Sequence, residues 1–569
     1  MRFFSRRTFV QGAVSSALLL GTARRSLSRA ASGSMLCGME FDLSIDRLPV
    51  NFTGRPRFAT AVNGQVPAPL LRWREGDTVT LRVTNRLPVS SSIHWHGVLV
   101  PAEMDGVPGL SFPGIAPGET YVYQFPIMQS GTYWYHAHSG FQEQTGLYGP
   151  IIIDPRGGES RHADQDYTVL LSDWSDSDPA HLFATLKRHS DYYNYGKHTV
   201  GDFLAEVRAR GWSAAVHDWG AWGQMRMDPT DLVDVSGATY TYLMNGMTPA
   251  ENWTALFNSG ENVRLRFING SAMSFFDIRI PDLTLTVVAA DGQDVEPVTV
   301  DEFRLGPGEV LDAIVVPKSD QAYTILAQSM DRSGYARGTL SPRDGLRAEV
   351  PALDARPQLT MADIGMGMTG MQNMGDMPGM RPSAANAPPN HDVNGYGPGV
   401  DMLIGAPRMT LDDPGAGLRN NGRRVLTYAD LHTLGGSLDP RDPVRDIELH
   451  LTGHMERYIW SFNGQKFSEA APIRLSYAER VRLVLVNDTM MIHPIHLHGM
   501  WSEVEGPEGR FQVRKHTVMV QPAQRLSYLV TADAIGRWAY HCHLTYHMAA
   551  GMFREILVMQ DAGSTGGRS

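Results

Sequence analysis

One segment of this sequence occurs three times, and this internal repeat limits the possible folds more than any other feature. Residues 79–85 read VTLRVTN, residues 263–269 read VRLRFIN, and residues 481–487 read VRLVLVN. An Asn-Gly pair precedes each copy, and a turn segment, such as APGE at 116–119, follows it. Polar and apolar residues that alternate with period two predict a β-strand. One β-rich unit therefore occurs three times in the chain.

Short strand patterns of this kind recur along the whole chain and are separated by Gly, Pro, Asn and Asp. They predict an all-β fold built from sandwiches or barrels. The three copies place domains at 36–156, 157–345 and 416–569, and a chain of 569 residues is long enough for three domains. Only the stretch 181–227 departs from the strand pattern, and there we expect a helical insertion.

The first thirty residues resemble an export signal. Residues 5–10, SRRTFV, form a twin-arginine pattern, and the apolar stretch 10–23 that follows is too short to span a membrane. We therefore expect residues 1–30 to be a signal peptide that directs the protein by the twin-arginine route to the bacterial periplasm.

Charge and composition exclude several classes of function. The net charge is −10, and residues 1–30 carry six arginines and no acid, so the exported chain is more acidic still. We expect no nucleic acid and no anionic membrane as partner. No apolar run reaches the roughly 18 residues that suggest a membrane span. The only cysteines are Cys37 and Cys542, so we expect no disulfide framework, with Cys37 as a bystander.

Residues 346–415, between the second and third copies, are rich in methionine. Seven methionines are separated mainly by Gly, Asp, Thr and Pro: Met361, Met366, Met368, Met371, Met374, Met377 and Met380. This composition cannot bury a core, so we expect a mobile loop. Thioether sulfur is a soft ligand that favours Cu(I). Two interpretations stay open: a flexible linker, or a segment that binds additional copper.

Ten of the twenty histidines fall in four short motifs. These are HWHG at 94–97, HAH at 136–138, HPIHLHG at 493–499 and HCHLTYH at 541–547. Successive side chains of a strand point to opposite faces, so His-x-His places both imidazoles on one face. Two such strands that face two others would enclose a metal cluster.

The repeat indicates which domains supply this cluster. Nine and eleven residues after the strand-end Asn stand His94 and His96 in the first copy, and His496 and His498 in the third. The middle copy has isoleucine at both positions. The second matching pairs are His136 with His138, and His541 with His543. The first and third domains therefore supply four histidines each, and the middle domain is a spacer without ligands.

The third domain alone has the residues for a second site. A thiolate from Cys542, imidazoles from His493 and His547, and a weak axial thioether from Met552 are the ligands of a blue copper site. Zinc, the competing metal, seldom takes an axial methionine. Because Cys542 lies between two cluster histidines, a covalent path joins the two sites.

These motifs resemble those of the multicopper oxidases, the family of laccases, ascorbate oxidase and cuprous oxidases. The resemblance covers nearly the whole mature chain and is closest to the bacterial copper-resistance oxidases of the CopA/PcoA type. It implies three cupredoxin-like Greek-key β-sandwich domains, with the Met-rich loop before the third. It also implies four coppers per chain, one of type 1, one of type 2 and two of type 3.

Carried over from the family, the ligand roles are as follows. Type 1 copper takes His493, Cys542, His547 and Met552. Type 2 copper takes His94 and His496. The type 3 pair takes His96, His136, His138, His498, His541 and His543.

Asp105 matches an acid that in the family lies near the cluster and helps to deliver protons. The reduction of O2 to water consumes four protons, so an acid there has a role. The competing interpretation is a turn residue, because Met104-Asp105-Gly106 is a plausible turn. Some family members carry a second acid directly after the last type 1 histidine. Here that position is Met548, which puts a second proton route through it in doubt.

Three functions are compatible with these residues. The first is a cuprous oxidase that couples oxidation of Cu(I) to reduction of O2 and so protects the periplasm from copper. The second is a laccase-like oxidase of small phenols or aromatic amines. The third is a copper-sequestering protein, although sequestration needs no electron path through Cys542.

Overall fold

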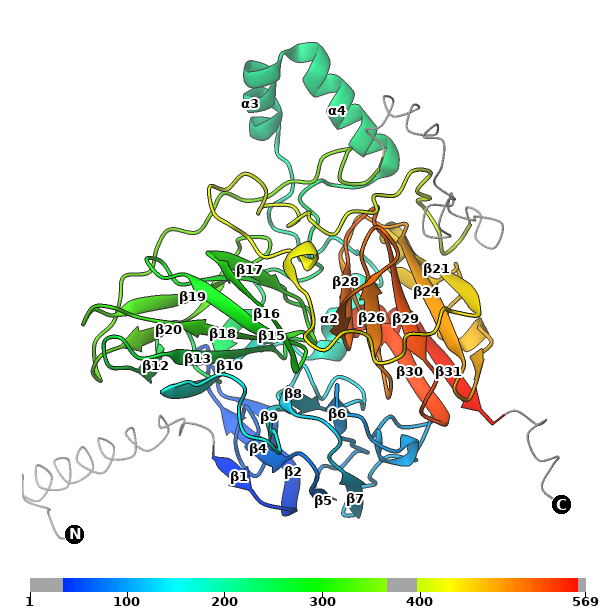
Figure 1. The fold of residues 1–569 in the computed structure, drawn as a ribbon. Helices are drawn as coiled ribbons and strands as arrows, with labels where there is room; N and C mark the ends of the chain where they lie inside the picture. The colour runs from blue at the N-terminus through cyan, green and yellow to red at the C-terminus, as the bar shows by residue number, and fades with distance from the viewer. Residues whose placement is uncertain (1–33, 366–396, 561–569) are drawn as a thin grey trace, which may run out of the picture.

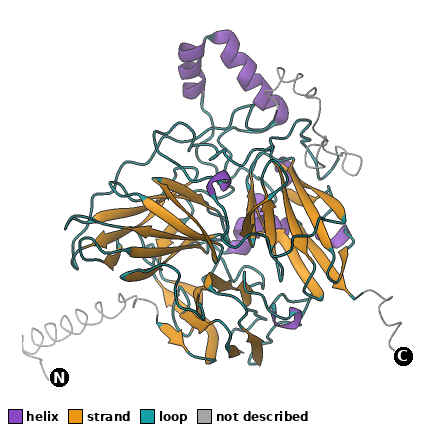
Figure 2. Cartoon of the chain, in the orientation of Figure 1, coloured by secondary structure: helices purple, strands orange, loops and turns teal. Residues whose placement is uncertain are grey.

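The computed structural model describes residues 34–365 and 397–560, and the chain forms three β-sandwiches that lie around a common centre (Figure 1). We call them sandwich 1, residues 35–154; sandwich 2, residues 165–341; and sandwich 3, residues 445–559. Within the described residues, strands make up these sandwiches, and helices and loops lie outside them (Figure 2). The all-β prediction is therefore confirmed.

Sandwich 1 has a five-stranded sheet, ordered β1-β4-β9-β8-β6, and a four-stranded sheet, ordered β3-β2-β5-β7. Its strands are β1 Met35–Cys37, β2 Glu40–Val50, β3 Arg57–Val62, β4 Leu70–Arg74, β5 Thr78–Asn85, β6 His94–His96, β7 Thr120–Pro126, β8 Gly131–His136 and β9 Tyr148–Asp154.

Sandwich 2 has sheets ordered β11-β10-β13-β18-β15-β16 and β12-β20-β19-β14-β17. Its strands are β10 Gln165–Trp174, β11 Thr241–Met244, β12 Trp253–Leu256, β13 Val263–Asn269, β14 Phe276–Arg279, β15 Leu285–Ala290, β16 Gln293–Val300, β17 Glu302–Leu305, β18 Val310–Val315, β19 Tyr323–Ser329 and β20 Tyr335–Ser341.

Sandwich 3 repeats this order, with sheets β22-β21-β24-β29-β26-β27 and β23-β31-β30-β25-β28. Its strands are β21 Arg445–His454, β22 Ile459–Phe462, β23 Ile473–Ser476, β24 Arg480–Asn487, β25 His493–Leu497, β26 Ser502–Glu505, β27 Phe511–Lys515, β28 Thr517–Val520, β29 Arg525–Thr531, β30 Gly536–Cys542 and β31 Phe553–Met559.

The repeated sequence segment takes the same place in each sandwich. Strands β5, β13 and β24 each pair in parallel with the first long strand of their sheet and antiparallel with a later one. The asparagine that ends the segment is buried and donates through its side-chain amide to two or three carbonyls, one of which lies in the loop that follows. These asparagines are Asn85, Asn269 and Asn487. The Asn therefore anchors the loop from which the next strand starts.

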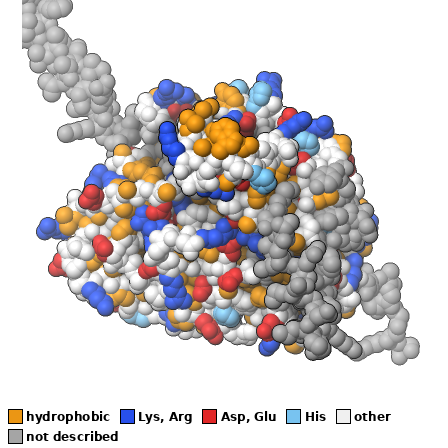
Figure 3. All heavy atoms as spheres, turned by 90° about the horizontal axis from the view of Figure 1, so that it is seen from above, with side chains coloured by type: hydrophobic (Ala, Val, Ile, Leu, Met, Phe, Trp, Pro, Cys, Tyr) orange, Lys and Arg blue, Asp and Glu red, His pale blue; other side chains and the backbone are white. Residues whose placement is uncertain are grey.

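Helices occur in the insertion predicted at 181–227 and at a few short positions. They are α2 Pro179–Leu186, α3 Val200–Arg210, α4 Trp212–Met225 and α5 Thr545–Ala550, with 3-10 turns at Ala102–Met104, Tyr428–Asp430, Met455–Arg457 and Phe467–Glu469. Helices α3 and α4 form a hairpin that projects above the sandwiches (Figure 1). Seen from above, an apolar patch lies on this face (Figure 3), and Val200 and Trp212 of the hairpin are exposed. In the described ranges no helix is long and apolar enough to cross a membrane.

The predicted signal peptide lies outside the described residues, as do six of the seven closely spaced methionines named above, all but Met361. The described flanks of that segment, 346–365 and 397–415, are turns and extended chain. They differ from the expected loop in one respect, because they pack on the sandwiches. Leu359, Ile364 and Ile404 are buried in the core shared by sandwiches 2 and 3, and Met361 lies against it.

Candidate metal centre

Four short strands place the predicted histidines in two facing sheets. Strand β6 pairs with β8, so that His94 lies opposite His136. Strand β25 pairs with β30 in the same way, so that His496 lies opposite His541. Eight imidazoles, four from sandwich 1 and four from sandwich 3, meet between the two sheets. All are buried except His138, which is half-buried.

The ring nitrogens converge in groups that could each hold a metal ion. One group is His96, His136 and His543, and another is His138, His498 and His541. His138 Nε2 lies 3.3 Å and His498 Nε2 lies 3.0 Å from His541 Nε2. The remaining two histidines, His94 and His496, face each other with their Nε2 atoms 3.4 Å apart.

The surroundings favour the neutral form of seven of these eight imidazoles, and this is the form that binds metal. Burial, and then the neighbouring histidines, lower the pKa of six of the eight rings well below the usual value: His96, His136, His138, His496, His498 and His543. Burial lowers the pKa of His541 to about 4. Among the described residues, neither ring nitrogen of His543 has a hydrogen-bond partner. A buried imidazole without hydrogen-bond partners lowers the stability of the fold unless it binds a metal.

A second set of donors lies in sandwich 3. Cys542 Sγ lies 3.5 Å from His493 Nδ1 and 3.9 Å from His547 Nδ1, and the two ring nitrogens are 3.2 Å apart. Met552 is fully buried, and its carbonyl accepts a hydrogen bond from the Cys542 amide. Burial raises the pKa of the Cys542 thiol, so a bound metal is needed to hold it as thiolate.

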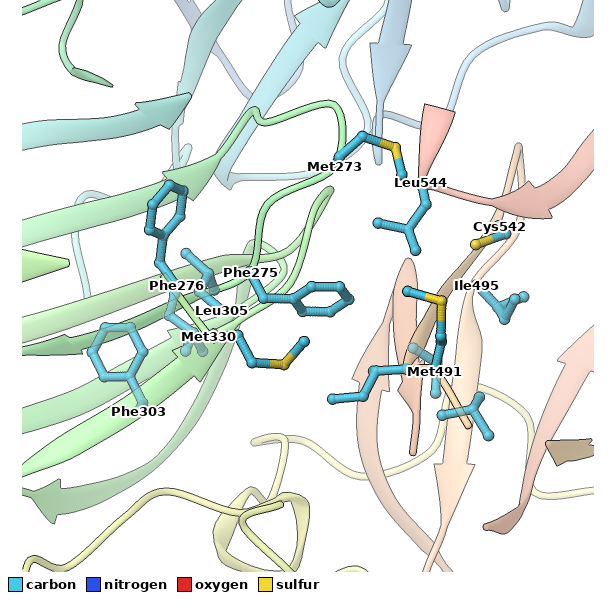
Figure 4. Close-up of a cluster of buried hydrophobic side chains, with 14 of the residues drawn as sticks. Met273, Phe275, Phe276, Phe303, Leu305, Met330, Met491, Ile495, Cys542 and Leu544 are labelled. Carbon is cyan, nitrogen blue, oxygen red and sulfur yellow. The ribbon is translucent and has the colours of Figure 1, made fainter. Parts of the chain in front are cut away.

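The apolar interface between sandwiches 2 and 3 surrounds this second set. Met273, Phe275 and Met330 of sandwich 2 point towards Met491 and Leu544 of sandwich 3, close to Cys542 (Figure 4). These side chains belong to one continuous core that spans both sandwiches. A dry, apolar shell of this kind controls solvent access and the local dielectric around a metal. Soft sulfur with imidazole in such a shell fits copper.

Consecutive residues of strand β30 and the turn after it join the histidine cluster to the Cys542 set covalently. His541 belongs to one triad of the cluster, His543 to the other, and Cys542 between them belongs to the mononuclear set. The covalent path expected from the sequence is therefore present in the fold.

Carboxylates and a hydroxyl lie within hydrogen-bond distance of several histidine rings. They contact the ring nitrogen that points away from the other metal-binding groups. Asp105 Oδ2 lies 2.9 Å from His498 Nδ1, and the Asp105 carbonyl lies 2.8 Å from His94 Nδ1. Asp105 thus touches one histidine from each sandwich. Such partners fix the orientation of a ring and the nitrogen that it offers to a metal.

Three further partners were missed by sequence reasoning. Glu143 Oε2 lies 2.9 Å from His136 Nδ1, and burial, with the charge of Asp173, raises the pKa of the Glu143 carboxyl well above its usual value. Thr489 Oγ1 lies 2.8 Å from His493 Nε2. Asp234 Oδ2 of sandwich 2 lies 2.8 Å from His547 Nε2. No motif or spacing marks these residues, and Asp234 shows that the middle unit is more than a spacer.

Comparisons with known proteins agree with this arrangement. Three family models, each described as multicopper oxidase, match residues 44–158, 165–343 and 440–562. The chain belongs to the multicopper oxidase family, and it is a copper-dependent oxidase that uses O2 and a reductant.

Among curated proteins, the chain is 56% identical to copper resistance protein A of Pseudomonas syringae pv. tomato, over 97% of this chain and 99% of that one. It is 55% identical to copper resistance protein A of Escherichia coli, with the same shares covered.

Solved structures share the fold. The laccase from Botrytis aclada matches with a TM-score of 0.64 at 21% identity, over 94% of this chain and 90% of that one. A multicopper oxidase from Pseudomonas thermotolerans matches with a TM-score of 0.57 at 21% identity, over 92% and 100%. The three sandwiches are therefore cupredoxin-like, as the resemblance implied.

Proposed function

We propose that the protein is a cuprous oxidase in copper resistance: four Cu(I) and O2 with four protons give four Cu(II) and two waters. The two relatives named copper resistance protein A support this role. Bound copper supplies the one-electron redox chemistry and the site of O2 reduction.

The proposal includes four resident coppers. Type 1 copper is held by His493, Cys542, His547 and Met552. Type 2 copper is held by His94 and His496. The type 3 pair is held by His96, His136, His138, His498, His541 and His543. The convergence of the ring nitrogens into these sets supports the assignment.

One observation favours Cu(I) over a phenol as the reductant. The outer edge of the His547 ring is covered by Asp234, and both side chains are buried. A bulky ring cannot contact His547 without displacing this carboxylate. A carboxylate at the same edge attracts a small cation and offers it an oxygen ligand next to the electron path.

The surroundings of Asp234 strengthen the attraction for a cation. Asp231 is also buried, and burial, followed by the charge of Asp234, raises its pKa well above the usual value. The charges of Asp191 and Asp228 raise the pKa of Asp231 further, and Lys197, which pairs with Asp191, opposes them only in part. A cation that enters this region relieves the repulsion between carboxylates, whereas a neutral phenol does not.

Asp105 is proposed as the acid that supplies protons at the cluster. It is buried beside His94 and His498, and its Oδ1 lies 3.3 Å from His94 Nδ1 without a hydrogen bond in the described part of the chain. A buried acid beside the site of O2 reduction is placed to hold and pass a proton.

Two further parts of the proposal rest on the sequence. Residues 1–30 direct export to the periplasm by the twin-arginine route, and the Met-rich segment binds additional Cu(I) through its thioethers. The laccase-like and copper-sequestering functions remain the alternatives.

Oxygen uptake by the copper-loaded protein, measured in parallel with Cu(I) and with a small phenol, tests the proposal. Faster uptake with Cu(I) is the expected result. Faster uptake with the phenol would favour the laccase-like function, and copper binding without oxygen uptake would favour sequestration.

A further inference from the structure

Asp291, in the turn between β15 and β16 of sandwich 2, reaches into sandwich 3. Its Oδ2 accepts hydrogen bonds from the backbone amides of His516 and Thr517, both at 3.1 Å. Its Oδ1 accepts from the Val310 amide at 3.0 Å, within its own sandwich. One fully buried carboxylate therefore ties the start of β28 to the sheet of sandwich 2.

The two residues that Asp291 holds contact two cluster histidines. The His516 carbonyl lies 2.7 Å from His496 Nδ1. Thr517 Oγ1 lies 3.0 Å from His96 Nε2. His96 belongs to sandwich 1 and His496 to sandwich 3, so a single dipeptide supports rings from both halves of the cluster.

Lys515 and Glu309 fix the position of Asp291. Lys515 Nζ lies 3.1 Å from Asp291 Oδ2 and 3.1 Å from Glu309 Oε1, and all three side chains are buried. Tyr428 donates a hydrogen bond of 2.7 Å to Glu309 Oε1. Burial by itself lowers the pKa of Lys515, but the charges of Asp291 and Glu309 outweigh it, so the ammonium stays charged.

The backbone next to Glu309 also lies against the cluster. A Cβ on Gly308 would lie 3.0 Å from the His543 ring and 3.1 Å from the His96 ring, and Gly308 has a positive φ of 86°. This turn of sandwich 2 therefore lies directly against rings from sandwiches 1 and 3, where a side chain would press on both.

We infer that Asp291, held by Lys515 and Glu309, is a positioning residue. It aligns His496 through the His516 carbonyl and His96 through the Thr517 hydroxyl. Sandwich 2, which supplies none of the proposed copper ligands, thus helps to set the geometry of the trinuclear site. The inference rests on the ligand assignment proposed above.

The test compares Asp291→Asn with Asp301→Asn as the matched control. Asp301 also lies in sandwich 2 and accepts a backbone amide from outside it, that of Arg424, but it contacts none of the proposed copper ligands in the described structure. The measurements are the blue absorption of the Cys542 site, the type 2 copper signal in electron paramagnetic resonance, and copper retained after mild chelation.

Loss of a group that hydrogen-bonds to a metal-binding histidine typically lowers the metal affinity by about 10–100-fold. Asp291→Asn should therefore retain the blue absorption. Its trinuclear site should bind copper with an affinity at least about tenfold lower than that of the control.

Two results would overturn the inference: full trinuclear copper in Asp291→Asn, or equal loss of both copper signals. If Asp291→Asn does not fold, Thr517→Val is the deciding variant. It removes the hydroxyl that contacts His96, His496 and His516 and keeps the backbone amide that Asp291 binds. It should weaken trinuclear copper and leave the blue absorption, and unchanged copper retention would count against the inference. A wild-type protein without blue colour would instead refute the ligand assignment itself.

Discussion

The His547 ring and the Asp234 carboxylate are 2.8 Å apart although 313 residues separate them in the chain. The contact joins the short helix α5 of sandwich 3 to the loop before β11 of sandwich 2. It covers the Nε2 edge of the imidazole, whereas Nδ1 faces Cys542 Sγ.

Replacing Asp234 with alanine should weaken the oxidation of Cu(I) and increase the oxidation of phenols. Without the carboxylate, oxidation of Cu(I) should fall by about tenfold or more, because the oxygen that would attract and bind the entering cation is lost. Oxidation of a small phenol should rise, because the ring edge is uncovered. Steady-state oxygen uptake with each reductant measures both effects. Asp282→Asn, in an exposed turn of the same sandwich, is the control and should change neither rate. Equal loss of both activities would contradict the prediction.

Cys542→Ser should abolish the blue absorption and turnover, because a hydroxyl does not replace the thiolate ligand. The eight cluster histidines are untouched, so about three coppers should remain by metal analysis, as the family resemblance implies. Cys37→Ser is the matched control, since Cys37 is exposed and distant from these ligands. A wild-type protein that is fully loaded with copper yet colourless would refute the type 1 assignment.

The methionines of the Met-rich segment should serve the substrate and not the fold. Residues 361–365 are best left intact, because Ile364 is fully buried and Asp363 forms an ion pair with Arg419. Changing the six methionines of residues 366–380 to leucine keeps the length and apolarity of the segment but removes the sulfur atoms. They are Met366, Met368, Met371, Met374, Met377 and Met380.

In this six-fold variant, the blue absorption and the melting temperature should be unchanged. Oxidation of Cu(I) should weaken, mainly at low Cu(I), because soft sulfur ligands concentrate that ion. Kinetics over a range of Cu(I) concentrations, with a phenol in parallel, provide the measurement. Intact Cu(I) oxidation with a collapse of phenol oxidation would favour the laccase-like function.

Stability should depend on pH through His450 of β21. Burial alone lowers the pKa of this ring, but Asp488, 2.7 Å from Nδ1, and Glu448, 3.1 Å from Nε2, raise it from 6.5 to about 9. Because the folded-state pKa is the higher one, the stabilisation is complete below about pH 6.5 and is lost as the pH rises through about 9.

Melting temperatures of the wild type and of His450→Gln, measured from about pH 6 to about pH 10, test this dependence. The difference in melting temperature between the wild type and His450→Gln should become smaller as the pH rises. The exposed His181, changed to Gln, should show no such trend. A difference that stays constant with pH would argue against a charged His450.

The sequence by itself determined the repeated unit and the donors. Alternation along a strand is a local property, so the three copies of the strand segment and each His-x-His pair predicted strands and shared faces. The order His541-Cys542-His543 is covalent, so the link between the two sites needed no tertiary information.

Only the tertiary structure decided which groups support those donors. Asp234, Glu143 and Asp291 carry no motif, and Asp234 and Asp291 reach their partners because sandwich 2 packs against sandwich 3 along a shared apolar core. The flanks of the Met-rich segment were expected to be loop, yet Ile364 is buried in the same core. Contacts of this kind depend on how separate units dock, and docking follows the shape of their whole surfaces and not the local pattern of a strand.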